Sequence, residues 1–175
     1  MHRGLIQIYC GDGKGKTTAA VGLCTRAAGC GMQILFAQFL KSSNTGERSV
    51  FSSLENVIMP EIPPDTKFVK DMSEVEFAHA KDFFSSLFKQ CYDCAVSGDF
   101  DIVVMDEIFS AIKYGIVTNE ILAELLVQKS PHTELVLTGR DPHESIIKLA
   151  DYVTEMQLIK HPYRRGISAR KGIEF

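Results

Sequence analysis

The stretch Gly11-Asp12-Gly13-Lys14-Gly15-Lys16-Thr17-Thr18 decides the fold class of this 175-residue chain. It follows an apolar run at residues 5–9 and opens a run of small residues at 19–23. This order of strand, glycine loop and helix is the one that a phosphate-binding loop requires. Glycines let backbone N–H groups turn toward one point without Cβ clashes, and the N-terminus of the following helix attracts an anion. The sequence therefore predicts a polyphosphate site here.

Each residue type in the loop has a chemical reason. Lys16 supplies a mobile positive charge, and the Thr17 hydroxyl can bind the Mg²⁺ that accompanies a polyphosphate. The common pattern G-x-x-x-x-G-K-[ST] would put its first glycine at Cys10, whereas this chain has it at Gly11. The shift indicates an unusual way of holding the phosphates; the alternative is a glycine-rich turn with a surface lysine. The candidate nucleotide-binding residues of the loop are Gly11, Asp12, Gly13, Lys14, Gly15, Lys16, Thr17 and Thr18.

Two acids, Asp106 and Glu107, end the apolar run at residues 101–107. A carboxylate beside a phosphate loop can hold Mg²⁺ directly or through water, so both are candidate metal ligands together with Thr17. The alternative is that they cap the next helix. Successive side chains of a strand alternate, so we expect the two acids to point in different directions.

Two arginines are further candidates. Arg140 follows the run at residues 135–138 and could bind phosphate or a substrate carboxylate with both guanidinium nitrogens. It could equally pair with Asp141 or Glu144 at the rim. Arg26 lies on the helix that leaves the loop, where it either reaches the nucleotide or is solvated.

Six short apolar runs alternate with helical patterns along the chain. We expect strands at residues 5–9, 34–39, 57–59, 102–105, 135–138 and 152–157. Strands separated by helices favour a mainly parallel sheet. The expected fold is α/β, a P-loop NTPase-like (RecA-like) sheet flanked by helices, with residues 1–175 as one domain. Ligands of such sheets bind at the carboxyl ends of the strands.

Two helices have clear predicted starts. Ser73 followed by Glu76 forms a capping box for a long helix that Gly98 ends. Asp141 followed by Glu144, with Pro142 at the first helical position, predicts a second capping box.

Composition excludes several classes of protein. A net charge of −3 argues against a general nucleic-acid binder. No apolar stretch approaches the roughly 20 residues of a membrane span. The first strand begins so early that we expect no signal peptide, and hence a cytoplasmic protein. Five cysteines, an odd number, favour reduced thiols.

Taken together, these residues resemble the P-loop ATP:corrinoid adenosyltransferases over nearly the whole chain. The shared marks are the loop at 11–18, Gln38-Phe39-Leu40-Lys41, Gly46-Glu47-Arg48, residues 103–107, Thr138-Gly139-Arg140 and the ending from Lys160 to Glu174. The family loop usually reads Gly-Asn-Gly-Lys-Gly-Lys-Thr-Thr. The glycine at position 11 is therefore the family's own form, and Asp12 replaces its usual asparagine.

The resemblance implies a homodimer of α/β subunits that adenosylates cob(I)alamin or a related corrinoid. It implies that ATP lies reversed in the loop with its ribose exposed, and that a flavoprotein reductant supplies cobalt(I). Cobalt would attack the 5′ carbon, and triphosphate would leave. In this scheme Lys16, Lys14, the loop N–H groups and Mg²⁺ on Thr17 and Glu107 stabilise the departing triphosphate. Lys16 and Glu107 are thus the candidate catalytic residues.

The chain departs from the family in one loop. Typical members carry Gly-Phe-Thr-Trp after the third strand, where aromatic rings shield the lower face of the corrin. This chain has no tryptophan, and the corresponding stretch reads Asp65-Thr66-Lys67-Phe68. Phe68 is the aromatic residue that could do part of this work; otherwise it is an ordinary apolar residue before the long helix.

Two other functions remain open from the sequence. One is phosphoryl transfer or NTP hydrolysis by a related P-loop fold, which would release ADP or orthophosphate instead of triphosphate. The other is a nucleotide-gated corrinoid carrier, which would bind the corrinoid without turnover.

Overall fold

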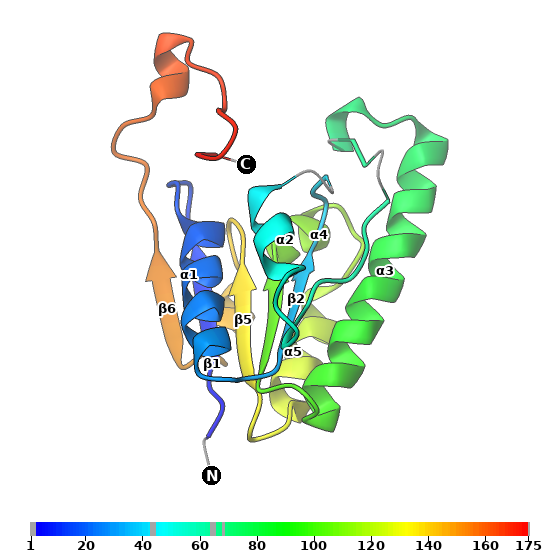
Figure 1. The fold of residues 1–175 in the computed structure, drawn as a ribbon. Coiled ribbons are helices and arrows are strands. Elements are labelled where there is room, and N and C mark those ends of the chain that lie inside the picture. Colours follow the sequence, from blue (N-terminus) through cyan, green and yellow to red (C-terminus); the bar gives the residue numbers. More distant parts are fainter. Residues whose placement is uncertain (1–2, 43–44, 64–65, 68, 175) are drawn as a thin grey trace.

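A six-stranded, wholly parallel sheet forms the centre of the protein (Figure 1). The computed structural model describes residues 3–42, 45–63, 66–67 and 69–174. The strands are β1 (Ile6–Cys10), β2 (Ile34–Gln38), β3 (Val57–Ile58), β4 (Ile102–Asp106), β5 (Glu134–Thr138) and β6 (Tyr152–Glu155). Their order across the sheet is β3-β2-β4-β5-β1-β6.

Helices cover both faces of this sheet. They are α1 (Lys16–Gly29), α2 (Gly46–Phe51), α3 (Glu74–Ser97), α4 (Ile108–Lys113), α5 (Asn119–Gln128) and α6 (Glu144–Ile147), with short 3-10 turns η1 (Val69–Asp71) and η2 (Pro162–Arg165). Side chains alternate between the faces, so Phe36 packs in the apolar cluster with α1 and α2, whereas Leu35 packs in the one with α3 to α6. Because both faces are covered, the three central strands β2, β4 and β5 are buried along their whole length.

The six predicted strands are all present, each within two residues of its expected ends. The capping box of α3 is also confirmed: the Ser73 hydroxyl accepts a hydrogen bond from the Glu76 N–H, and Gly98 ends the helix with φ 80°. The second predicted capping box is wrong. Asp141 has φ 49°, in the left-handed region, and α6 starts at Glu144 with His143 as its N-cap. An N-cap needs extended backbone, which His143 has and Asp141 lacks.

The carboxyl ends of the strands form one edge of the molecule, at the top of Figure 1. The glycine loop lies here between β1 and α1, and the C-terminal segment that follows β6 turns back above it. Three non-glycine residues with left-handed backbone lie just past strands at this edge: Leu40, Glu107 and Asp141. Left-handed backbone in such residues is energetically costly and gathers at functional sites. This edge of the sheet is therefore the expected location of a functional site.

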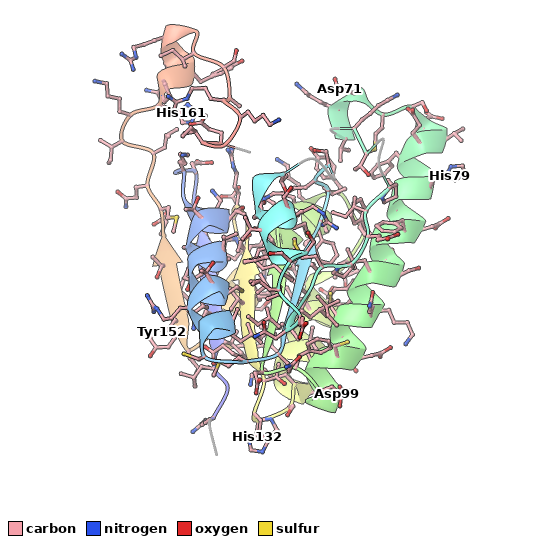
Figure 2. All side chains as sticks on the ribbon, in the orientation of Figure 1. Asp71, His79, Asp99, His132, Tyr152 and His161 are labelled. Carbon is pink, nitrogen blue, oxygen red and sulfur yellow. The ribbon has the colours of Figure 1, made fainter. Side chains whose placement is uncertain are left out.

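The other end of the molecule is built from turns between helices and strands. Figure 2 shows Asp99 and His132 at this end, and Asp71 at the edge that carries the glycine loop. Within the described residues, no helix is both long and apolar enough to span a bilayer.

Candidate functional site

The glycine loop is pressed against the end of β6. Gly13 donates its N–H to the carbonyl oxygen of Met156 at 2.6 Å. A Cβ atom at Gly11 or Gly13 would lie 2.6 Å or 2.5 Å from that same oxygen, closer than real Cβ atoms come. Gly11 and Gly15 also have positive φ, at 94° and 119°. Close backbone approach and left-handed geometry both explain why this loop uses glycine.

Lys16 begins α1 and is almost fully buried. Its Nζ donates to the carbonyl oxygens of Gly11 at 2.6 Å and Gly13 at 2.8 Å, so the ammonium lies across the loop. Burial lowers the pKa of Lys16, the nearby carboxylate of Glu107 acts in the opposite direction, and Arg140 lowers the pKa further. A buried cation with only carbonyl partners is well prepared to bind an anion.

The Thr17 hydroxyl connects the loop to β4. It donates to Asp106 Oδ1 at 2.9 Å, and Thr138 at the end of β5 donates to the same oxygen at 2.6 Å. We expected the end of β4 to lie beside the loop, but β5 lies between β1 and β4. The side chains of Thr17 and Asp106 bridge that extra strand, so the two parts of the predicted metal site do meet.

A lysine that was assigned no role from the sequence occupies the same place. Lys41, after β2, donates from Nζ to Asp106 Oδ2 at 2.6 Å and to Thr17 Oγ1 at 2.8 Å. Gln38, at the end of β2, approaches Asp106 Oδ2 at 3.5 Å and donates to Glu47 at 2.8 Å. Their position at the carboxyl end of a strand is the signal that could have identified both residues.

Glu107 makes other contacts than Asp106, as we expected, but strand alternation is not the reason, because β4 ends at Asp106. It has φ 63° and is the N-cap of α4, and its Oε2 accepts a hydrogen bond from the Ser110 hydroxyl at 2.7 Å. Asp106 rather than Glu107 contacts Thr17. Glu107 still lies close enough to Lys16 to affect its pKa.

Arg140 reaches the tip of the loop. Its guanidinium pairs with Asp12 at 3.1 Å, with both side chains largely exposed. The alternative partners Asp141 and Glu144 are not the ones used, since Glu144 pairs with Lys148 at 2.8 Å. The Asp12 carboxylate therefore holds Arg140 beside the phosphate loop.

One predicted residue is not brought to this centre. Arg26 lies in the last turn of α1, ten residues after Lys16, which places it about 15 Å further along the helix. Phe68 lies outside the described residues.

A cavity of about 980 Å³ opens beside the loop. Thr17, Thr18 and Lys41 line one side of it, and Ile173 and Glu174 of the C-terminal segment line another. Lys14 holds that segment in place, because its Nζ donates to the Ile173 carbonyl at 3.0 Å and lies 3.7 Å from Glu174. Asp71, on the opposite side from the C-terminal segment in Figure 2, also lines it. The cavity is large enough for a sizeable ligand next to the phosphate site.

The donor set fits Mg²⁺. Thr17 and Asp106 offer hard oxygen atoms, and the ammonium of Lys41 lies within hydrogen-bond distance of both side chains. No group of three or more His, Cys, Asp or Glu side chains suited to a metal occurs among the described residues. Mg²⁺ commonly uses one or two protein ligands and takes the rest from phosphates and water, so the oxygens of Thr17 and Asp106 are a sufficient protein share of its ligands.

Sequence comparison gives one consistent family. The model described as ATP:corrinoid adenosyltransferase BtuR/CobO/CobP matches residues 2–175. A corrinoid adenosyltransferase of Pseudomonas aeruginosa is 33% identical over 176 residues, covering 99% of this chain and 84% of the relative. A corrinoid adenosyltransferase of Escherichia coli K12 is 31% identical over 178 residues, covering 99% and 86%. Corrinoid adenosyltransferase CobA of Salmonella typhimurium is 31% identical over 176 residues, with the same coverage.

Comparison with solved structures gives the fold. A KaiC-like protein from Pyrococcus horikoshii superposes with a TM-score of 0.56 at 16% identity, covering 91% of this chain and 75% of that one. ATPases 2 and 3 of EssC from Geobacillus thermodenitrificans give 0.52 at 13% identity, covering 97% of this chain and 35% of that one. At these identities the likeness concerns the fold alone, which is that of P-loop NTPases.

Proposed function

The chain belongs to the ATP:corrinoid adenosyltransferase family, whose members transfer the adenosyl group of ATP to cob(I)alamin, and we propose that its glycine loop holds the triphosphate end of ATP during that transfer. The observation that carries this proposal is the buried Lys16 ammonium lying across the loop, next to a large cavity. The sugar end of ATP would face the cavity, where the corrinoid substrate would bind.

The proposed reaction is a displacement at carbon. The electron pair of cobalt(I) forms a bond to the 5′ carbon of ATP, the bond from that carbon to oxygen breaks, and triphosphate leaves with the electron pair. Cobalt carries no proton to lose, so no general base is required. The enzyme must align the two reactants and stabilise the negative charge that gathers on the triphosphate.

The chain's own residues suit that second task. Lys16 and the free N–H groups of the first turn of α1 would bind the phosphates. Lys14 and Arg140, at the rim of the loop, would add positive charge. Glu107 would act indirectly, since its negative charge raises the pKa of Lys16 and so opposes the lowering effect of burial.

Thr17 and Asp106, whose side chains are in contact, would hold Mg²⁺, whereas Glu107, the other predicted metal ligand, accepts a hydrogen bond from Ser110. When bound, Mg²⁺ would neutralise part of the charge on the triphosphate. Buried Thr138 fixes the Asp106 carboxylate for this role by its hydrogen bond to Oδ1.

The family resemblance supports finer proposals. We propose that residues 1–175 form one domain, that the protein is a cytoplasmic homodimer, and that a flavoprotein supplies the reduced corrinoid. The unbroken six-stranded sheet supports the single domain. Light scattering on the purified protein tests the dimer, which should have twice the mass of one chain.

The phosphorus products test the proposed function. The protein is incubated anaerobically with ATP, Mg²⁺ and chemically reduced cobalamin, and the products are followed by ³¹P NMR. We expect intact triphosphate in equal amount to the adenosylated corrinoid. ADP or orthophosphate would instead indicate a phosphotransferase or NTPase, and tight corrinoid binding without any product would indicate a carrier.

A further inference from the structure

Lys41 contacts both oxygen atoms that the proposed metal site offers. Its Nζ lies 2.6 Å from Asp106 Oδ2 and 2.8 Å from Thr17 Oγ1. Lys16 makes no such contact, since its ammonium binds the loop carbonyls. These two lysines therefore have separate partners: Lys16 binds carbonyl oxygens of the phosphate loop, and Lys41 binds the Asp106 carboxylate.

Burial explains why Asp106 needs a positively charged partner. Asp106 is 0% exposed, and a buried carboxylate without compensation is very costly. Hydrogen bonds from Thr17 and Thr138 satisfy Oδ1, and Lys41 supplies the ion pair to Oδ2. The side chain of Lys41 is 23% exposed, so it can leave the carboxylate toward the cavity without crossing the core.

A divalent cation would need the same oxygen lone pairs of Thr17 and Asp106 that Lys41 contacts. Thr17 already donates its hydroxyl hydrogen to Asp106, so its lone pairs are what remain for a cation, and one of them accepts the Lys41 N–H. Mg²⁺ requires oxygen ligands at 2.0–2.1 Å. An ammonium and Mg²⁺ cannot both be seated between these two oxygens, because their positive charges would be nearly in contact.

We propose that Lys41 is a built-in competitor of the divalent cation, an ammonium that must leave Thr17 and Asp106 before Mg²⁺ can bind them. The proposal rests on the assignment of these two residues as metal ligands in the proposed function. It gives Lys41 two positions: on the carboxylate without the metal, and in the cavity with it. Lys41 thereby weakens metal binding and also keeps the buried carboxylate compensated when no metal is bound.

Binding of Mn²⁺ to the protein without ATP or corrinoid tests this directly. The free Mn²⁺ signal is followed by EPR during titration of the wild type, Lys41→Met and Lys67→Met. Lys67 is the matched control, because it lines the same cavity but pairs with Glu76 at 2.6 Å. We expect Lys41→Met to bind Mn²⁺ about tenfold or more tightly than the wild type, and Lys67→Met to stay within about twofold.

Three results would overturn the proposal: unchanged or weaker Mn²⁺ binding by Lys41→Met, an equal gain in Lys67→Met, or a gain that persists when Asp106→Asn is added. Lys41→Gln, which keeps an N–H donor for Asp106, serves if the methionine variant does not fold. As a second readout, Mg²⁺ should raise the melting temperature of the Lys41 variants more than that of the wild type. None of these measurements depends on turnover, so they separate this proposal from a failure of adenosyl transfer.

Discussion

Lys16 shows how one side chain can be prepared for an anion before the anion arrives. Its stem is buried at the start of α1, and its ammonium binds two carbonyl oxygens of the loop. A bound polyphosphate would exchange these neutral partners for charged oxygens, which form stronger hydrogen bonds.

Replacing Lys16 by alanine should therefore abolish most of the activity. We expect kcat/KM for ATP to fall by about 10²- to 10³-fold, because stabilisation of the leaving triphosphate is lost. Far-UV circular dichroism should be unchanged. Lys89→Ala is the control, since Lys89 forms an exposed pair with Asp93 on α3 and should not affect turnover. Near-normal turnover by Lys16→Ala would remove the loop from the mechanism.

At the scale of elements, the position of the loop depends on β6. Gly13 and the Met156 carbonyl lie so close that no side chain fits between them. Conformational freedom in a tight loop therefore explains only half of the need for glycine in this motif. The other half is contact with an edge strand far away in the sequence.

Two glycine substitutions separate these effects. Gly13→Ala should lower the free energy of unfolding by more than about 2 kcal/mol, because its Cβ would clash with backbone atoms of Met156 and Gln157, which directly follow β6. Gly22→Ala, in the exposed middle of α1 with nothing within 4 Å, should raise it by about 0.5–1 kcal/mol. Urea denaturation measures both. Equal effects of the two substitutions would contradict the role given to β6.

The start of α3 should respond to acid. Hydrogen bonds from Lys67 and from the Ser73 backbone lower the pKa of Glu76 to about 2. Since the folded pKa lies below the ordinary value of 4.5, this contribution to stability is present above pH 4.5 and is lost as pH falls toward about 2. The protection of the first-turn amides of α3 against hydrogen exchange, measured relative to the intrinsic rate at each pH, should fall in that window. In Glu76→Gln the first turn should exchange faster at neutral pH and lack this change with pH.

The whole molecule brings together segments that a linear sequence separates. Apolar runs between helical patterns were sufficient to predict six strands and a parallel sheet, because burial on both faces imposes that pattern. The glycine loop could also be predicted, because its strand, glycines and helix are consecutive in the sequence, and it identified one half of the site. The features that could not be predicted depend on which strands are neighbours in the sheet. They are the position of β5 between β1 and β4, the ion pair of Lys41 with Asp106, and the ion pair of Asp12 with Arg140.

The C-terminal segment is the part of the molecule whose role is least evident from local pattern. It is almost wholly exposed, yet Ile173 and Glu174 line the cavity and contact Lys14. Deleting residues 167–175 should change the free energy of unfolding by less than about 1 kcal/mol, since few core contacts are lost. Turnover with cob(I)alamin should fall about tenfold because the cavity loses one wall. Unchanged kinetics would show that this wall does not position substrate.

The central claim is that this chain joins the 5′ carbon of ATP to cobalt. The most direct test uses ATP carrying ¹³C at the 5′ position, with Mg²⁺ and reduced cobalamin under anaerobic conditions, followed by ¹³C NMR and photolysis of the product. We predict that the label appears in a light-sensitive, cobalt-bound carbon, and that Lys16→Ala does not form it. Label that remains in ATP, ADP or AMP, with no light-sensitive product, would contradict the account.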